Sequence, residues 1–192
     1  VGTEAQKLYV DAKVMLEKIA DESWLECKGV FGLFPAATSG DDILIYSPSE
    51  PSRVIKTSHN LRQQNQKAQG LPNFCLSDFI APVQSKKTDY IGAFAVTSGD
   101  QIDPIVKAFE EKNDDYQAIL LKSLADRLAE ATAEYVHYLV RKEYWGYQPD
   151  ENLENEDLIK EKYVGIRPAP GYPACPDHTE KETIFSLLNV TE

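Results

Sequence analysis

The sequence lacks both a long apolar run and an excess of basic residues. Its longest apolar stretch, Ile91 to Val96, has six residues, whereas a transmembrane helix needs about 18. The 31 Asp and Glu residues outnumber the 20 Lys and Arg residues, which gives a net charge of −11 near pH 7. Binding to a polyanion requires clustered Lys and Arg. We therefore expect no membrane span and no nucleic-acid partner.

Cysteine is scarce and odd in number. The three cysteines, Cys27, Cys75 and Cys175, are widely spaced, which argues against a disulfide framework and favours a reducing compartment. The chain starts at Val1 with a polar, acidic stretch, so no signal peptide is expected. These features predict a cytoplasmic protein.

Several enzyme motifs are also absent. The sequence has no Gly-x-Gly-x-x-Gly after a strand, no phosphate loop ending in Gly-Lys-Ser/Thr, no Gly-x-Ser-x-Gly elbow and no Cys-x-x-Cys. A Rossmann enzyme or an ordinary serine hydrolase is therefore not expected.

One short stretch contains groups that bind metals or act as nucleophiles. Cys175, Asp177 and His178 lie close in sequence, but His59 and His137 are isolated, and zinc requires about four well-spaced ligands. No metal site is predicted, and Cys175 is expected to be a buried thiol. A small hydrolase using Cys175 and His178 is a minor alternative, since no third group to orient them is apparent. No catalytic residue is predicted.

The order of the periodic segments predicts the fold class. With 42% hydrophobic and 27% charged residues, the 192-residue chain has the composition of a folded globular protein. Apolar residues at spacings of three and four predict helices over 2–20, 104–111 and 115–143. Short β-rich runs predict strands at Val30–Phe34, Ile43–Tyr46, Arg53–Thr57, Phe74–Ala81 and Asp89–Thr97. The pattern predicts an α+β fold, in which a mostly antiparallel sheet packs with helices, one of them long.

Four further local features are predicted. The last strand is apolar enough over Tyr90–Val96 to be buried on both faces, so we expect it to be central. The aromatic cluster Tyr144–Tyr147 is interpreted as core. A short helix is expected near Asp157–Tyr163, and a final helix opening at Thr179, with Glu182 completing a capping box.

A proline-rich segment, Gly165–Thr179, is hard to explain by packing alone. Its four prolines hold φ near −65°, so the loop is stiff before any ligand arrives and loses little entropy on binding. Arg167 offers a planar fork for a carboxylate, Gly171 permits close approach to the backbone, and Tyr172 has an apolar ring with a polar tip. The alternative is a structural strap with Arg167 paired to a surface acid.

Three carboxylates recur every four residues on the long helix, at Asp126, Glu130 and Glu134. Like charges at this spacing repel unless a cation lies against them. Lys122 and Arg127 are candidates, which describes an ordinary solvated face. The other interpretation is a cationic ligand, with Arg167 and an acid such as Glu130 holding its two ends.

The segment Gly165–Lys181 resembles the Arg-Pro-Ala-Pro-Gly-Tyr-Pro signature of the S-adenosylmethionine-binding activation domain of cobalamin-dependent methionine synthase. The similarity extends in the family's order over nearly the whole chain. It includes Leu61–Gln64, Cys75–Pro82, Asp89–Val96, Ala125–Glu134 and Trp145–Tyr147. The fold that the resemblance implies is a twisted antiparallel sheet with helices, unlike that of Rossmann methyltransferases.

The resemblance implies a module that binds S-adenosylmethionine so that its methyl group passes to an inactivated cobalamin. The cobalamin would lie on a partner domain or chain, and a flavodoxin-type reductant would supply an electron. The implied ligand contacts are Arg167, Ala169 through its backbone, Gly171, Tyr172 and Glu130. Such a module belongs to a methyltransferase but turns over no substrate alone. The alternative is an interaction module that docks on a corrinoid protein or flavodoxin without binding the methyl donor.

The same resemblance suggests the extent of the domain. Residues 1–192 are expected to form a single activation-type domain. The family's domain also has an Asp-Trp-Thr-Pro stretch before this region and a Ser-Gly-x-Tyr-Phe region after it, which this sequence does not contain. We expect an excised piece or a shortened relative.

Overall fold

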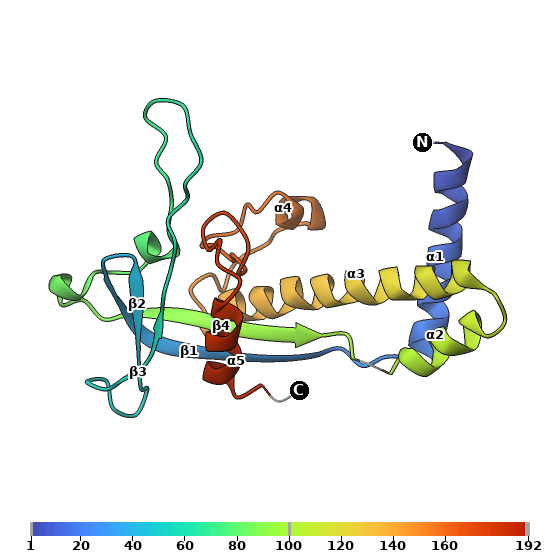
Figure 1. Ribbon diagram of the computed structural model, residues 1–192, viewed down its shortest axis with the longest axis horizontal. Coiled ribbons are helices and arrows are strands. Elements are labelled where there is room, and N and C mark those ends of the chain that lie inside the picture. The colour runs from blue at the N-terminus through green and yellow to red at the C-terminus, as the bar shows by residue number, and fades with distance from the viewer. Residues whose placement is uncertain (1, 100, 191–192) are drawn as a thin grey trace. The chain divides into compact units, whose positions relative to one another are not determined.

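The chain forms two compact units, each described by itself. The computed structural model describes residues 2–99 and 101–190. The helical unit combines Val1–Gly29 with Val96–Tyr138, and the sheet unit combines Val30–Ala95 with Leu139–Glu192. Each unit therefore joins segments that are far apart in sequence, as the colours of Figure 1 show.

Three helices make the helical unit: α1 (Thr3–Asp21), α2 (Asp103–Glu110) and α3 (Asp115–Leu139). Their apolar residues at spacings of three and four form one inward face on each helix. The buried core contains Met15 and Ile19 of α1, Val106 of α2, and Leu121 and Leu124 of α3. The structure confirms the predicted helices here, apart from the C-terminal end of the long one.

The sheet unit is built on four strands, β1 (Lys28–Ser39), β2 (Asp42–Tyr46), β3 (Val54–Ser58) and β4 (Asp89–Thr97), in the order β3-β2-β1-β4. β2 pairs antiparallel with both β1 and β3. Ala36, Ile43 and Ile45 form the buried core, and Leu187 of α5 (Glu180–Leu188) packs against it. The predicted α+β class with a mostly antiparallel sheet is confirmed.

Two strand predictions are wrong. β4 lies at an edge of the sheet, because the long strand β1 pairs with β2 on its other side. Consistent with an edge position, Tyr90 is 42% exposed. Phe74–Ala81 forms no strand and contains the 3₁₀ helix η1 (Leu76–Phe79). There the Asp78 carboxylate accepts a hydrogen bond from the Cys75 backbone N–H (2.9 Å), which turns the chain.

The long helix changes its hydrogen-bonding pattern after Leu139. Val140–Tyr144 form a π-helix, η3, and the Trp145 N–H donates to the carbonyl of Val140 (3.0 Å). The predicted helix does extend to Glu143, but the prediction is wrong in that the last turn is a π-helix and not an α-helix. A π turn inserts an extra residue and changes which side chains face inward.

The aromatic cluster after this turn is more exposed than predicted. Tyr144 is 55% and Trp145 40% exposed, so the interpretation of this cluster as core is wrong for these two. They contact other rings edge-on or tilted: Trp145 lies 6.3 Å from Tyr90 and 5.5 Å from Tyr147 between centroids. Aromatic pairs of this kind are stable at a surface without full burial.

The remaining elements of the sheet unit are short. The 3₁₀ helix η2 covers Val83–Ser85, and α4 covers Asn155–Ile159. The helix predicted near Asp157–Tyr163 therefore begins two residues earlier and ends at Ile159. No helix among the described residues combines the length and the apolar character needed to cross a membrane.

Candidate functional site

The proline-rich loop, Gly165–Thr179, is closed by its own backbone. The Tyr172 N–H donates to the Ala169 carbonyl (3.0 Å), the Gly171 N–H to the Cys175 carbonyl (2.8 Å), and the Cys175 N–H to the Tyr172 carbonyl (2.9 Å). Tyr172 and Cys175 thereby form an isolated antiparallel β-bridge. Since the prolines between and around these bonds have a fixed φ, the loop has little backbone freedom. Its geometry agrees with the stiff loop that the proline spacing predicts.

Cys175 fastens this loop to the end of β3. The residue is 4% exposed, and its Sγ lies 3.9 Å from Oδ1 of the buried Asn60, whose Nδ2 donates to the Ser58 carbonyl (3.0 Å). Burial, followed by the nearby charge of Glu180, raises the pKa of Cys175 to about 11. A thiol with a raised pKa is little ionised at neutral pH and a weak nucleophile. The predicted buried thiol is confirmed, and the geometry disfavours the hydrolase alternative.

The three cysteines are expected to differ sharply in their reaction with iodoacetamide at pH 8. Cys27 is exposed, whereas Cys75 and Cys175 are buried and all three are free thiols. Peptide mass spectrometry of the native protein should show rapid labelling of Cys27 and little labelling of the other two, because alkylation needs an accessible thiolate. Labelling in urea provides the fully reactive control. Equal native labelling of Cys175 and Cys27 would contradict the buried arrangement.

The end of the loop starts helix α5 in a way that differs from the prediction. α5 begins at Glu180, and the Thr179 N–H donates to Asp177 Oδ1 (2.8 Å), which lowers the pKa of Asp177. The Thr179 side chain makes no capping hydrogen bond. The predicted capping box with Glu182 is wrong because Asp177 already takes the N–H that Glu182 would need.

The predicted ligand residues of the loop lie within six positions of one another. Arg167 is half-buried, whereas Ala169, Gly171 and Tyr172 are exposed. Tyr172 is 63% exposed and offers its ring to solvent. The sheet unit thus brings four of the five predicted contacts together in one closed loop.

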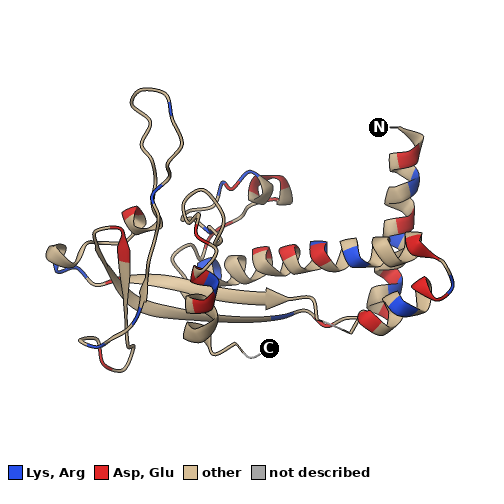
Figure 2. Ribbon diagram, in the orientation of Figure 1, with Lys and Arg blue, Asp and Glu red and all other residues tan. Residues whose placement is uncertain are grey.

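The fifth predicted contact, Glu130, lies on α3 in the helical unit. Its Oε2 is 2.8 Å from Nη1 of Arg127, and the two side chains are 63% and 71% exposed. Figure 2 shows a row of acidic residues along this helix, with basic residues next to it. The suggestion that Arg127 offsets the acidic row is confirmed, whereas Lys122 instead pairs with Glu110 (3.0 Å).

An ion pair that the sequence analysis missed is buried in the sheet unit. Arg141 is 0% exposed; its Nε and Nη2 each donate to one carboxylate oxygen of Glu151 (2.7 Å), and its guanidinium lies 4.4 Å from the Tyr163 ring centroid. The ion pair and the cation–π contact connect the start of the π-helix to the segment before the proline-rich loop. No local pattern marks Arg141, because its partners are 10 and 22 positions away.

A second group of ionic side chains is centred on Arg62, which lies in the segment Leu61–Gln64. Arg62 donates to both carboxylate oxygens of Asp78 (2.6 and 2.8 Å) and to Asp41 Oδ1 (2.6 Å), and it also donates to the Asn73 carbonyl (2.9 Å). The guanidinium lowers the pKa of Asp78. Arg62 therefore closes the base of the loop between β3 and η1. Its role in this structure is to hold that loop.

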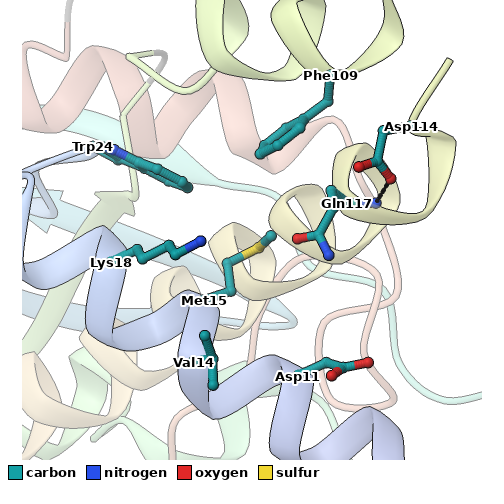
Figure 3. A pocket seen from close by; sticks show the side chains of 8 residues that line it. All are labelled: Asp11, Val14, Met15, Lys18, Trp24, Phe109, Asp114 and Gln117. Atoms are coloured by element: carbon teal, nitrogen blue, oxygen red, sulfur yellow. Dashed lines mark hydrogen bonds between the residues drawn. The ribbon is translucent and has the colours of Figure 1, made fainter. Parts of the chain in front are cut away.

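A hollow of about 290 Å³ lies among the helices of the helical unit. Figure 3 shows Trp24 and Phe109 on one side, Met15 and Val14 on the other, and Lys18 reaching toward the space between them. Other lining groups already have structural partners: Asp11 accepts from the Tyr116 hydroxyl (2.8 Å), and Asp114 accepts from the Gln117 N–H at the start of α3 (3.2 Å). None of the predicted ligand residues lines this hollow.

We also searched residues 2–99 and 101–190 for side chains arranged as metal ligands. Within these ranges, no three His, Cys, Asp or Glu residues are grouped so that they could hold a metal ion.

The family model described as "Vitamin B12 dependent methionine synthase, activation domain" matches residues 1–192. The chain belongs to this family. It is also similar to a crystal structure of the MetH reactivation domain bound to AdoHcy, with 60% sequence identity and a TM-score of 0.91. The alignment covers 98% of this chain and 58% of that chain. The chain thus spans little more than half the length of its solved relative.

Proposed function

We propose that this activation domain binds S-adenosylmethionine and supports the reductive methylation that reactivates cobalamin in methionine synthase. The observation that carries the proposal is the closed loop presenting Arg167, Ala169, Gly171 and Tyr172, in a chain 60% identical to a domain described as bound to AdoHcy. AdoHcy is S-adenosylhomocysteine, which remains after S-adenosylmethionine gives up its methyl group. A site for one is therefore a natural site for the other.

The residues of the loop fit the chemistry of this ligand. S-adenosylmethionine carries a carboxylate, an ammonium, a sulfonium and a flat purine. The Arg167 guanidinium suits the carboxylate, and the exposed Tyr172 ring offers an apolar face with a polar tip. Glu130, which pairs with Arg127 in the helical unit, stays a prediction for the cationic end. The ligand supplies the methyl group, while these residues bind and orient it and carry out no chemistry on it themselves.

Titration calorimetry with S-adenosylmethionine tests the proposal. We expect Arg167→Ala to weaken binding about 30- to 100-fold, because a charge-assisted hydrogen bond contributes roughly 2–3 kcal/mol. Arg53→Ala, in the exposed turn before β3, is the matched control and should bind like the parent. No heat with the parent chain, or equal affinity of the parent and Arg167→Ala, would refute the proposal.

We further propose that the cobalamin is presented by a partner domain or protein and that a flavodoxin-type donor supplies the electron. Family membership supports the first partner. In this scheme the domain catalyses no turnover alone, and its free cysteines suit the reducing cytoplasm. Pull-down by a cobalamin-loaded partner, with and without S-adenosylmethionine, tests the docking. Equal retention with and without S-adenosylmethionine, together with no calorimetric heat from the donor, would favour an interaction module that does not bind the donor.

A further inference from the structure

We infer that His178 is a positioning residue for the ligand loop, an inference that rests on the proposed function. The imidazole of His178 lies against Gly171, in the space that a side chain at position 171 would need. A Cβ added at Gly171 would fall 2.7 Å from His178 Nε2 and 2.9 Å from Nδ1. Non-bonded heavy atoms have their optimal separation near 3.5–4.0 Å. The ring therefore fills the place that the glycine leaves open.

Gly171 is required here for its backbone as well. Its φ is +99°, in a region that residues with a Cβ rarely adopt, and its N–H donates to the Cys175 carbonyl (2.8 Å). A glycine in this conformation has wide freedom unless its neighbours restrict it. The β-bridge restricts the Gly171–Tyr172 backbone by hydrogen bonding, and the His178 ring restricts it by contact.

His178 is itself held by the start of α5. Its carbonyl accepts a hydrogen bond from the Lys181 N–H (3.2 Å), and the neighbouring Asp177 carboxylate accepts one from the Thr179 N–H (2.8 Å). Because α5 packs on β3, the backbone of His178 is tied to the sheet. The contact of the His178 ring with Gly171 therefore helps to fix the position of the loop relative to α5.

The consequence concerns Tyr172. Tyr172 is 63% exposed, so little packing sets the direction of its side chain, and that direction depends on the peptide that precedes it. Without the His178 ring, only the hydrogen bonds of the loop restrict Gly171, and ligand binding must then complete the ordering of the Gly171–Tyr172 peptide. His178 acts through Gly171 and Tyr172, and we assign it no contact with the ligand.

Calorimetry with S-adenosylmethionine on the full 192-residue chain tests this role. His178→Ala should weaken binding roughly five- to tenfold, the usual effect of ordering one or two groups on binding. His178→Phe keeps a flat ring and should bind within about twofold of the parent. His59→Ala removes another exposed histidine, one whose ring faces Asp42 (3.2 Å), and should leave the affinity unchanged. Thermal melting of each variant shows whether it is folded.

A double variant separates positioning from general destabilisation. If His178 acts through Tyr172, His178→Ala combined with Tyr172→Ala should bind no more weakly than Tyr172→Ala alone. The inference would be overturned if the losses of affinity in the two single variants multiplied in the double variant. It would also be overturned if His178→Phe failed to restore the affinity, or if His178→Ala bound as tightly as the parent. These outcomes presuppose that the parent binds. Absence of binding by the parent would instead refute the proposed function, so the two failures are distinguishable.

Discussion

Replacing Arg141 with alanine is expected to lower the free energy of unfolding of the sheet unit by about 3–5 kcal/mol. The side chain of its partner Glu151 is only 5% exposed, so the substitution leaves a carboxylate buried without its counter-charge. The contact between the guanidinium and the Tyr163 ring is lost as well. Urea denaturation measures the change, and a Trp24→Phe background leaves Trp145 as the fluorescent reporter in the sheet unit.

Two control variants test whether the effect of Arg141→Ala comes from the burial of its ion pair with Glu151. Lys122→Ala breaks the exposed pair with Glu110, whose side chains are 56% and 48% exposed, and should cost less than about 1 kcal/mol. The double variant Arg141→Met/Glu151→Leu should be more stable than Arg141→Ala, since no buried charge remains alone. A cost of Arg141→Ala as small as that of Lys122→Ala would show that the pair is not buried in solution.

Leu121→Ala is expected to destabilise the helical unit by about 2–5 kcal/mol. Leu121 is 0% exposed and lies in the core formed by α1, α2 and α3, so its truncation leaves a cavity. Trp24 packs against this core and lies edge-on to Phe109, with ring centroids 6.4 Å apart. In a Trp145→Phe background, the fluorescence of Trp24 therefore reports the unfolding of this unit.

The same helix supplies the control for Leu121. Ile119 lies two positions away and is 64% exposed, so Ile119→Ala removes a similar side chain from the surface. Its effect should stay within about 0.5 kcal/mol. If Ile119→Ala and Leu121→Ala were equally destabilising, the inward face assigned to α3 would be incorrect.

Much of the candidate loop was predictable because its chemistry is local. Proline restricts its own φ whatever surrounds it, and the closed backbone around Gly171 agrees with that restriction. The buried state of Cys175 was also anticipated. The His178 ring at Gly171 was not, because it joins residues seven positions apart across a turn whose direction the sequence does not state.

The wrong predictions concern segments whose structure depends on contacts with residues far away in the sequence. The run Phe74–Ala81 has strand-like composition, but Asp78 binds the Cys75 N–H and Arg62 and makes a 3₁₀ turn instead. Tyr135 of α3 continues the three-and-four spacing of Leu121, Leu124 and Leu128, yet it is 60% exposed. Periodicity shows that one face is apolar without showing how far the covering element extends.

The sequence by itself determined the helices of the helical unit, most strand positions, the stiffness of the proline-rich loop and the family resemblance. Spacing along a chain and the geometry of proline act between near neighbours, so they can be read without coordinates. Only the tertiary structure decided that β4 is an edge strand, that Arg141 is buried with Glu151, and that His178 rests on Gly171. Each of these depends on which residues the fold brings into contact, and local sequence patterns do not encode that.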